Sequence, residues 1–237
     1  MALFNAEVSQ KLRGVLDQMT DPVRIVLFTQ EFECQFCREA RQFVEELTGL
    51  SSKLSLAVYE LVADQVIADR FGVDKVPAIL LLDQAGQDLR LRFYGIPAGY
   101  EINSFLSAIL AAAGRRETIP PDLRARIDRI NQDVLLQVYV SLACPNCPEA
   151  VMAANLLALE NPRIRAEMIE TAMFVHLALQ HNVSSVPKTI INGRTEFVGA
   201  LPVPMLLEMI DFAAEEAAGG LPGAKAADPG KAGNPGL

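Results

Sequence analysis

The feature that most constrains this chain is a pair of cysteines that occurs twice at a fixed distance. Cys34 and Cys37 stand three positions apart, and Cys144 and Cys147 repeat this spacing 110 positions later. Each pair follows an apolar run rich in β-branched residues and precedes apolar residues at helical spacing. The pattern therefore predicts, twice over, a buried strand, a thiol pair and a helix.

A second feature repeats with the same offset. The dipeptide Val76-Pro77 recurs as Val186-Pro187, so that both halves count 43 positions from the first cysteine to the proline. The offset also relates two glutamates that each end an apolar run, Glu60 and Glu170. Because unrelated domains would not share these distances, we interpret the chain as an internal duplication.

The place of the thiols predicts their chemistry. At a helix N-terminus, unpaired N–H groups and the positive end of the helix dipole favour thiolate over thiol. We therefore expect a lowered pKa for the first cysteine of each pair, Cys34 or Cys144, which makes it the nucleophile. Cys37 and Cys147, one turn further on, are placed to resolve a mixed disulfide.

Composition restricts the partners and the compartment. The 237 residues are 51% hydrophobic and carry a net charge of −8 without a basic run, which disfavours nucleic acid and anionic membranes as partners. Apolar stretches are too short to span a membrane, and the first residues lack the features of a signal peptide. All four cysteines fall in the two pairs, which in a reducing cytosol are usually redox or metal sites. We expect a cytoplasmic protein.

The expected element order is the same in both halves, β-α-β-α-β-β-α, after an opening helix. We predict an α/β fold of two units, 1–117 and 118–218, each with a four-stranded mixed sheet and helices on both faces. A Gly, Pro and Ala-rich segment, 219–237, is expected to be a flexible tail. The expected strands are 23–29, 54–61, 78–82, 89–94, 134–140, 164–169, 188–191 and 195–198.

These features resemble the tandem thioredoxin-fold protein disulfide oxidoreductases, glutaredoxin-like proteins known mainly from thermophiles. The segments that carry the resemblance are Cys34-Gln35-Phe36-Cys37 with Pro77, and Cys144-Pro145-Asn146-Cys147 with Pro187. The resemblance implies that both prolines follow cis peptide bonds and lie against the thiols. It also implies that the main chain of Val76 and Val186 pairs with an extended substrate, which tolerates many substrate sequences.

The chain also departs from related families. It has no Trp, and Phe28 and Val138 stand where thioredoxins place a buried carboxylate that aids proton transfer. Glu60 and Glu170, at neighbouring strand ends, are the candidates for this role, although a solvated charge at a strand end is the simpler interpretation. The glutathione-binding features of glutaredoxins are absent, so a glutathione site is not expected.

The two centres are not expected to be equivalent. Negative charge near the first pair disfavours thiolate, although Arg38 offsets part of it; the acidic residues are Glu31, Glu33 and Glu39. Near the second pair, Lys188 follows Pro187 and is expected to bring a positive charge toward the sulfurs. We therefore predict the lower thiolate pKa at Cys144, which then meets substrates, with the first pair as a second centre or an electron relay.

The sequence thus predicts an enzyme, a protein disulfide oxidoreductase without cofactor or metal, whose direction of electron flow is open. Expected partners are protein disulfides and dithiols, with a thioredoxin reductase-like flavoprotein as a candidate for recycling. One alternative is an electron carrier between a flavin-dependent reductase and a peroxidase. It resembles the N-terminal tandem domain of alkyl hydroperoxide reductase flavoproteins, where usually only the second unit keeps its cysteines. Another alternative is a non-enzymatic binding or metal-storage module. A single zinc site formed by all four cysteines is disfavoured, because the two pairs are far apart in the sequence.

Overall fold

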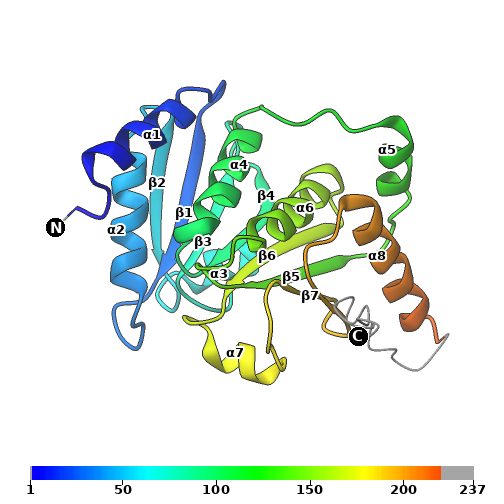
Figure 1. Ribbon diagram of the computed structural model, residues 1–237. Helices are drawn as coiled ribbons and strands as arrows, with labels where there is room; N and C mark the ends of the chain where they lie inside the picture. Colours follow the sequence, from blue (N-terminus) through cyan, green and yellow to red (C-terminus); the bar gives the residue numbers. More distant parts are fainter. Residues whose placement is uncertain (1, 220–237) are drawn as a thin grey trace, which may run out of the picture.

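The computed structural model describes residues 2–219, whose strands form one continuous eight-stranded sheet (Figure 1). The strand order is β2-β1-β3-β4-β6-β5-β7-β8. The predicted tail lies outside the described residues, except for Gly219. The strands are β1 Val23–Thr29, β2 Leu54–Glu60, β3 Ala78–Leu82, β4 Asp88–Tyr94, β5 Val134–Val140, β6 Ile164–Glu170, β7 Lys188–Ile191 and β8 Thr195–Val198.

Helices cover both faces of the sheet (Figure 1). Helices α1, α2, α4, α6 and α8 pack on one face around the larger core, and the short helices α3 and α7 pack on the other. The bounds are α1 Ala6–Leu16, α2 Cys37–Thr48, α3 Gln65–Phe71, the 3₁₀ turn η1 Gly99–Glu101, α4 Ile102–Ala112, α5 Pro121–Asp128, α6 Cys147–Glu160, α7 Val175–Gln180 and α8 Val203–Ala217.

The inner strands are apolar on both faces because helices cover both. Every residue of β3 is buried, and β1 has one exposed position, Arg24. Such continuous apolar runs are typical of sheets that are buried on both sides. The outer strand β2 is half-buried along most of its length, as an edge strand is expected to be.

The structure confirms two units, each with a four-stranded mixed sheet, and adds a junction that the sequence did not predict. Strand β4 of the first unit pairs in parallel with β6 of the second, from Leu91 opposite Ala166 to Tyr94 opposite Ile169. The two predicted sheets are therefore one. The boundary near residue 117 remains a prediction, because one core cluster runs through both units.

Side chains reinforce this junction. Arg90 of β4 donates to the carbonyl oxygen of Ile164 at 3.2 Å and also to that of Ala158 in α6. Burial lowers the pKa of Arg90, whose charge is close to Arg116 and Arg92 and is partly offset by Asp88. The junction thus combines main-chain pairing with a cation that caps carbonyls of the other unit.

The topology places both cysteine pairs at the same end of the parallel strands of the sheet. Strands β1, β4, β6 and β5 all run in the same direction, so the C-terminal ends of β1 and β5, which lead to the cysteines, lie on the same side of the sheet, where these strands end. The two strands are four positions apart in the sheet order, which corresponds to roughly 19 Å at the usual strand spacing.

We expect the two units to unfold together. Leu91 is fully buried in β4 within the shared core, so Leu91→Ala should lower the free energy of unfolding by about 2–5 kcal/mol. Urea denaturation followed by circular dichroism should keep one cooperative transition, shifted to lower urea. The control Val62→Ala, at a position that is 73% exposed, should leave the midpoint nearly unchanged. Two separate transitions, of which only one shifts, would contradict this expectation.

Candidate active site

Both cysteine pairs are joined as disulfides, with Cα–Cα separations of 5.5 Å. In each pair the first cysteine is half-buried and the second is buried. Cys34 and Cys144 are therefore the sulfurs nearer to solvent, and Cys37 and Cys147 lie behind them with exposed fractions of 2% and 0%. This arrangement suits an attacking first thiol and a resolving second thiol.

Each helix begins at the second cysteine of its pair, so the first cysteine lies just before the helix N-terminus. Helix α2 starts at Cys37 and α6 at Cys147, and the residues before them, Phe36 and Asn146, make no side-chain capping hydrogen bond. The first-turn N–H groups are therefore not satisfied by a capping side chain. Pro148 removes one of these donors from α6.

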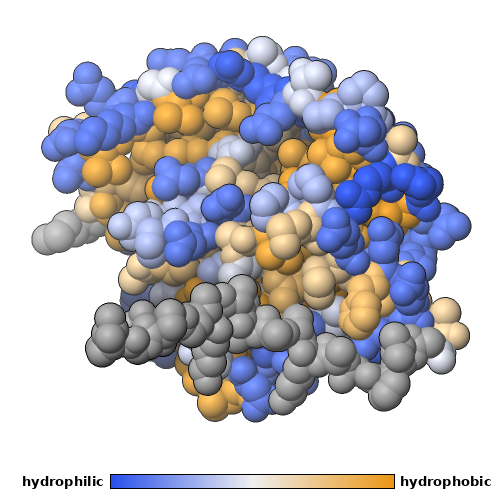
Figure 2. Space-filling view, turned by 45° about the vertical axis from the view of Figure 1, so that its right-hand side comes forward, coloured by the Kyte–Doolittle hydropathy of each residue, from blue (hydrophilic) through white to orange (hydrophobic). Residues whose placement is uncertain are grey.

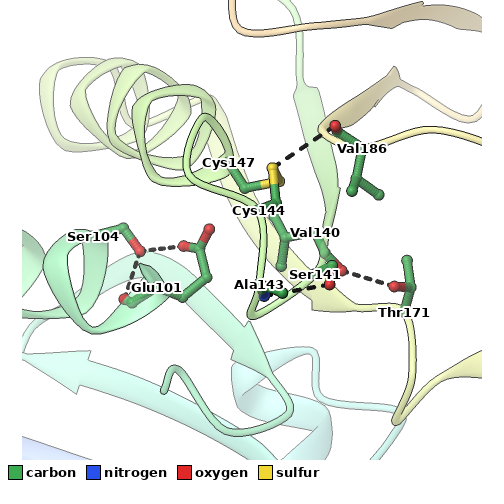
Figure 3. The surroundings of a disulfide bond; sticks show 9 residues. All are labelled: Glu101, Ser104, Val140, Ser141, Ala143, Cys144, Cys147, Thr171 and Val186. Carbon is green, nitrogen blue, oxygen red and sulfur yellow. Dashed lines mark hydrogen bonds between the residues drawn. A yellow bond between two sulfur atoms is a disulfide. The ribbon is translucent and has the colours of Figure 1, made fainter. Parts of the chain in front are cut away.

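Both Val-Pro bonds are cis, as the resemblance implied. These are Val76-Pro77 and Val186-Pro187. At the second centre the Sγ of Cys144 lies 3.8 Å from the carbonyl oxygen of Val186 (Figure 3). At the first, β3 begins directly after Pro77 with Ala78 opposite Phe28, so the proline lies beside the end of β1. The cis bonds are thus as the resemblance implied, and the contact of Pro77 with the thiols of the first centre stays a prediction.

The first centre borders a polar hollow of about 650 Å³. Cys34 and Cys37 line it together with polar and charged residues, among them Arg38, Arg41 and Glu60. The carboxylate of Glu60 accepts a hydrogen bond from the backbone N–H of Glu31 at 3.2 Å. Glu60 therefore shares a solvent-accessible space with the sulfurs, and its proton-transfer role stays a prediction.

The loop of the second centre is held by the first unit. The backbone N–H of Tyr100 in η1 donates to the carbonyl oxygen of Leu142 at 3.0 Å. Gly99 has a φ of +56°, and a Cβ at this position would collide with the Leu142 carbonyl group. The close approach of η1 to the Cys144 loop therefore requires glycine at position 99.

This approach brings a buried carboxyl group to the second centre. Glu101 is fully buried and extends from η1 toward the Cys144–Cys147 loop, and η1 contacts α6 (Figure 3). The hydroxyl of Ser104 donates to the Oε2 atom of Glu101. Within residues 2–219, the Oε1 atom has no hydrogen-bond partner. One carboxyl oxygen therefore remains available to a proton at this site.

The surroundings of Glu101 change its acidity. Burial raises the pKa of Glu101 from 4.5 to about 7, and the hydrogen bond from Ser104 opposes this shift only in part. A carboxyl group that titrates near neutral pH exchanges a proton with a thiol far more readily than an ordinary glutamate does.

Two other predicted residues are engaged elsewhere. Glu170 is buried and accepts a hydrogen bond from the N–H of Met173 at 2.7 Å; burial raises its pKa. Lys188 is also buried, and its ammonium group pairs with Glu196 at 2.8 Å and donates to the carbonyl oxygen of His181. The positive charge that we expected beside the sulfurs is thus compensated by Glu196. The proton-transfer role of Glu170 remains a prediction.

The cysteines do not form one metal site, because they lie in separate disulfides at the ends of β1 and β5. Among the described residues, no group of His, Cys, Asp and Glu has the arrangement of a metal site. In the same part of the chain, no helix has the length and apolar character needed to cross a bilayer.

Two repeated units, each with a disulfide where a strand leads into a helix and a cis-proline directly before a neighbouring strand, define a tandem thioredoxin fold. The family profile of the thioredoxin domain matches residues 134–211, within the second unit. The alkyl hydroperoxide reductase protein AhpF of Pseudomonas aeruginosa is 29% identical over 212 residues, which are 90% of this chain. The chain spans only 38% of the length of that relative.

Two solved structures have the same fold over nearly their whole length. The N-terminal domain of AhpF from Enterococcus faecalis is 27% identical, with a TM-score of 0.81 over 86% of this chain and 98% of that one. A protein disulfide oxidoreductase from Aeropyrum pernix is 26% identical, with a TM-score of 0.82 over 90% and 94%. The chain is thus a thioredoxin-fold protein homologous to both groups.

Glu101 is the site residue that the sequence analysis missed. It is the only charged residue between Arg92 and Arg115, and it directly precedes the apolar helix α4. A lone charge in such a stretch indicates a buried and specific role, because a carboxylate is costly to bury without a function or a partner.

We expect Glu101 to make the stability of the oxidised protein depend on pH. Its pKa is about 7 in the folded state and near 4.5 when exposed, so its stabilising effect is complete below pH 4.5 and is lost as the pH rises through 7. When the pH rises from 5 to 8, the free energy of unfolding of the Glu101→Gln variant should therefore fall by roughly 2–3 kcal/mol less than that of the wild type. Urea denaturation at each pH measures this difference.

The exposed Glu149 of α6 provides the matched control. Glu149→Gln should follow the pH dependence of the wild type. If Glu101→Gln also follows it, the buried carboxyl group does not titrate in this range.

Proposed function

We propose that the protein exchanges dithiols and disulfides with protein substrates, and that Cys144 is the principal attacking residue. The observation that carries this proposal is the second centre itself. A half-buried Cys144 faces the main chain of Val186 before a cis-proline, and the protonatable Glu101 is buried at η1, which contacts the helix α6 that begins at the buried Cys147. The main chain of Val186 is suited to pair with an extended segment of any sequence.

In the reducing direction, the thiolate of Cys144 attacks a substrate disulfide and forms a mixed disulfide, and one substrate sulfur leaves as thiolate. Glu101, as carboxylate, takes the proton of the Cys147 thiol. Cys147 then attacks the sulfur of Cys144, forms the intramolecular disulfide and releases the second substrate sulfur. The proton on Glu101 passes to a departing thiolate. The substrate gains two electrons, and the same steps in reverse oxidise a dithiol.

The first centre follows the same scheme with Cys34 and Cys37. Its hollow contains three carboxylates against two guanidinium groups, and negative charge disfavours thiolate; the carboxylates are Glu31, Glu39 and Glu60. We therefore keep the lower thiolate pKa for Cys144, although Pro148 removes one amide donor there. Within this proposal, Glu60 accepts the proton of Cys37.

A second candidate function is an electron carrier between a flavin-dependent reductase and a peroxidase. Similarity to the alkyl hydroperoxide reductase protein AhpF over 90% of the chain supports it. Turnover of a peroxidase with a thioredoxin reductase-like flavoprotein, dependent on this chain, would favour the carrier. Reduction of many unrelated protein disulfides favours the general oxidoreductase. The cytoplasmic location remains a prediction from cysteine usage.

We expect Cys144→Ser to lower the rate of insulin reduction by dithiothreitol about tenfold or more, because it removes the main nucleophile. Cys34→Ser should retain most of the rate. Cys147→Ser should accumulate a mixed disulfide with insulin that is visible on a non-reducing gel. A larger loss in Cys34→Ser than in Cys144→Ser would reverse the ranking of the two centres.

We also expect the two centres to exchange electrons only between molecules. Their strands are separated by roughly 19 Å, whereas disulfide exchange needs sulfur atoms in bonding contact. Fully reduced protein is treated with a substoichiometric disulfide, quenched with acid and alkylated, and each pair is quantified by peptide mass spectrometry. The rate of redistribution between pairs should rise in proportion to protein concentration. A rate independent of concentration would show a direct internal relay.

A further inference from the structure

The outer edge of β2 has no partner strand within residues 2–219, although the equivalent edge in the second unit has one. Strand β2 is the last strand of the sheet on the side of the first unit. Counted by the offset of 110 positions, β2 corresponds to β6, whose outer edge pairs in parallel with β4. The molecule therefore contains one occupied and one open copy of the same edge.

The same four positions of the two strands differ in exposure. In β6 they are at most 1% exposed beside β4, and they are Ala166, Glu167, Met168 and Ile169. In β2 the corresponding residues, 56–59, are half-buried, since no strand of the described chain lies beside them. A strand that added to β2 would bury these four positions as β4 buries those of β6.

Strand β2 lacks the features that usually prevent an edge strand from pairing. Such edges are blocked by charged residues, prolines, bulges or short length. Residues 55–59 are Ser, Leu, Ala, Val and Tyr, and the seven residues of β2 pair with β1 without a register shift. Strand β8, at the opposite end of the sheet, has four residues and carries Glu196. Of the two outer strands, β2 is the one suited to receive another strand.

The two faces beside β2 differ in polarity. On the face of α2, the position that corresponds to the buried Val151 of α6 is occupied by the exposed Arg41, which pairs with Glu45 at 2.8 Å. On the other face, at the end of β2 and the start of α3, Val62 and Val66 are 73% and 84% exposed. An added strand therefore meets charged groups on one side and an apolar surface on the other.

This difference excludes a second copy of the chain that would bind β2 as the first unit binds the second. Beside the occupied edge, α4 packs on α6, and Figure 2 shows hydrophobic residues recessed between hydrophilic ones on the helical side of the molecule. A helix brought onto α2 in the same way would bury the ion pair of Arg41 and Glu45, which costs desolvation. The open edge is thus suited to a strand without a covering helix.

We propose that the outer edge of β2 binds an extended segment of a partner protein, which adds to the sheet as a strand parallel to β2. Apolar side chains of this segment lie opposite Ala57 and Tyr59, which pack on the α3 side, and alternate with polar side chains on the α2 side. A parallel segment runs toward Glu60, which lines the hollow of the first centre. The partner is therefore a substrate whose reactive cysteine follows an alternating strand; this step rests on the proposed function of Cys34.

The binding test uses the full chain and a short fluorescent peptide that alternates valine and threonine between a terminal lysine and a terminal glutamate. Its net charge is zero, so the acidity of the protein does not decide the result. We expect saturable binding by fluorescence anisotropy. The same peptide with N-methylated amides keeps its side chains but donates no main-chain hydrogen bonds, and it should bind about tenfold or more weakly.

Hydrogen exchange followed by mass spectrometry locates the peptide. Amides of residues 55–59 should exchange more slowly when the peptide is bound, and those of 195–198 should not change. Ala57→Glu should weaken binding about tenfold or more, because it places a carboxylate under the apolar side of the added strand. The control Ala125→Glu adds the same charge at an exposed position of α5 and should bind as the wild type does. Thermal melts confirm that both variants are folded.

The direction of the strand is tested at the first centre in the reduced Cys144→Ser/Cys147→Ser variant. The peptide carries an added cysteine, as a mixed disulfide with thionitrobenzoate, at its C-terminal or its N-terminal end. The thiolate of Cys34 attacks the peptide sulfur and displaces thionitrobenzoate. Cys37 then attacks Cys34 and passes its proton to the departing peptide sulfur; the protein loses two electrons and the mixed disulfide gains them. The C-terminal version should react about tenfold or more faster, because binding raises its effective concentration at Cys34.

The proposal is overturned if the peptide does not bind saturably, if N-methylation leaves its affinity unchanged, or if protection appears outside 55–59 only. Protection of 55–59 that increases with protein concentration without peptide would assign the edge to a second copy, which also overturns it. Equal rates for the two mixed disulfides contradict the parallel direction. If neither mixed disulfide reacts while binding and protection persist, the failure lies in the proposed redox function of Cys34 and not in the binding edge.

Discussion

The parallel pairing of β4 with β6 is the interaction on which the rest of this structure depends. It joins two four-stranded sheets into one, from Leu91 opposite Ala166 to Tyr94 opposite Ile169. Because this pairing is parallel, the strands that lead to the two cysteine pairs run in the same direction, and both disulfides open on one edge of the molecule. It also sets the separation between them, four strand positions, so that the centres are neighbours on a surface without being in contact. A protein substrate that reaches one centre therefore approaches the same side of the molecule as a substrate at the other.

Because of the junction, residues of both units surround the second centre. The chain leaves β4 at the shared edge and reaches η1, where Tyr100 bonds to Leu142 and Gly99 permits the close approach. The next residue, Glu101, is then buried where η1 contacts α6 of the other unit, and burial raises the pKa of its carboxyl group to about 7. Thioredoxin-type chemistry needs a proton acceptor for the buried thiol. In the proposed mechanism that acceptor is Glu101 of the neighbouring unit, whereas the equivalent place in β5 is occupied by Val138.

The sequence predicted those features that repeat or that have a local pattern. The two cysteine pairs, the cis-prolines Pro77 and Pro187, and the order of strands and helices all follow from spacing, periodicity and resemblance. The joining of the sheets was not predictable in this way, because β4 and β6 are edge strands whose pairing leaves no local signal. Lys188 shows a second limit: its position after Pro187 suggested a charge near the sulfurs, but side-chain direction in a strand alternates, and its ammonium group meets Glu196 instead. Glu101 was missed because only the junction gives it a role.

The junction is also the reason why two repeated units do not make two equal sites. It joins edge strand β4 of the first unit to edge strand β6 of the second, so the contact is heterologous. In the second unit, the strand that corresponds to β4 is β8. Among the described residues, no further strand pairs with the outer edge of β8. Aligned from the glycines that follow these strands, Gly95 and Gly199, the residue that corresponds to Glu101 is Met205. Met205 lies in the first turn of α8 and is 48% exposed, because no third unit packs there within residues 2–219. A glutamate at that position would be hydrated and would titrate as an ordinary carboxylate. The shift in acidity thus arises from the place of a residue in the tandem arrangement. At the first centre, at the other end of the sheet, the predicted proton acceptor is the more accessible Glu60.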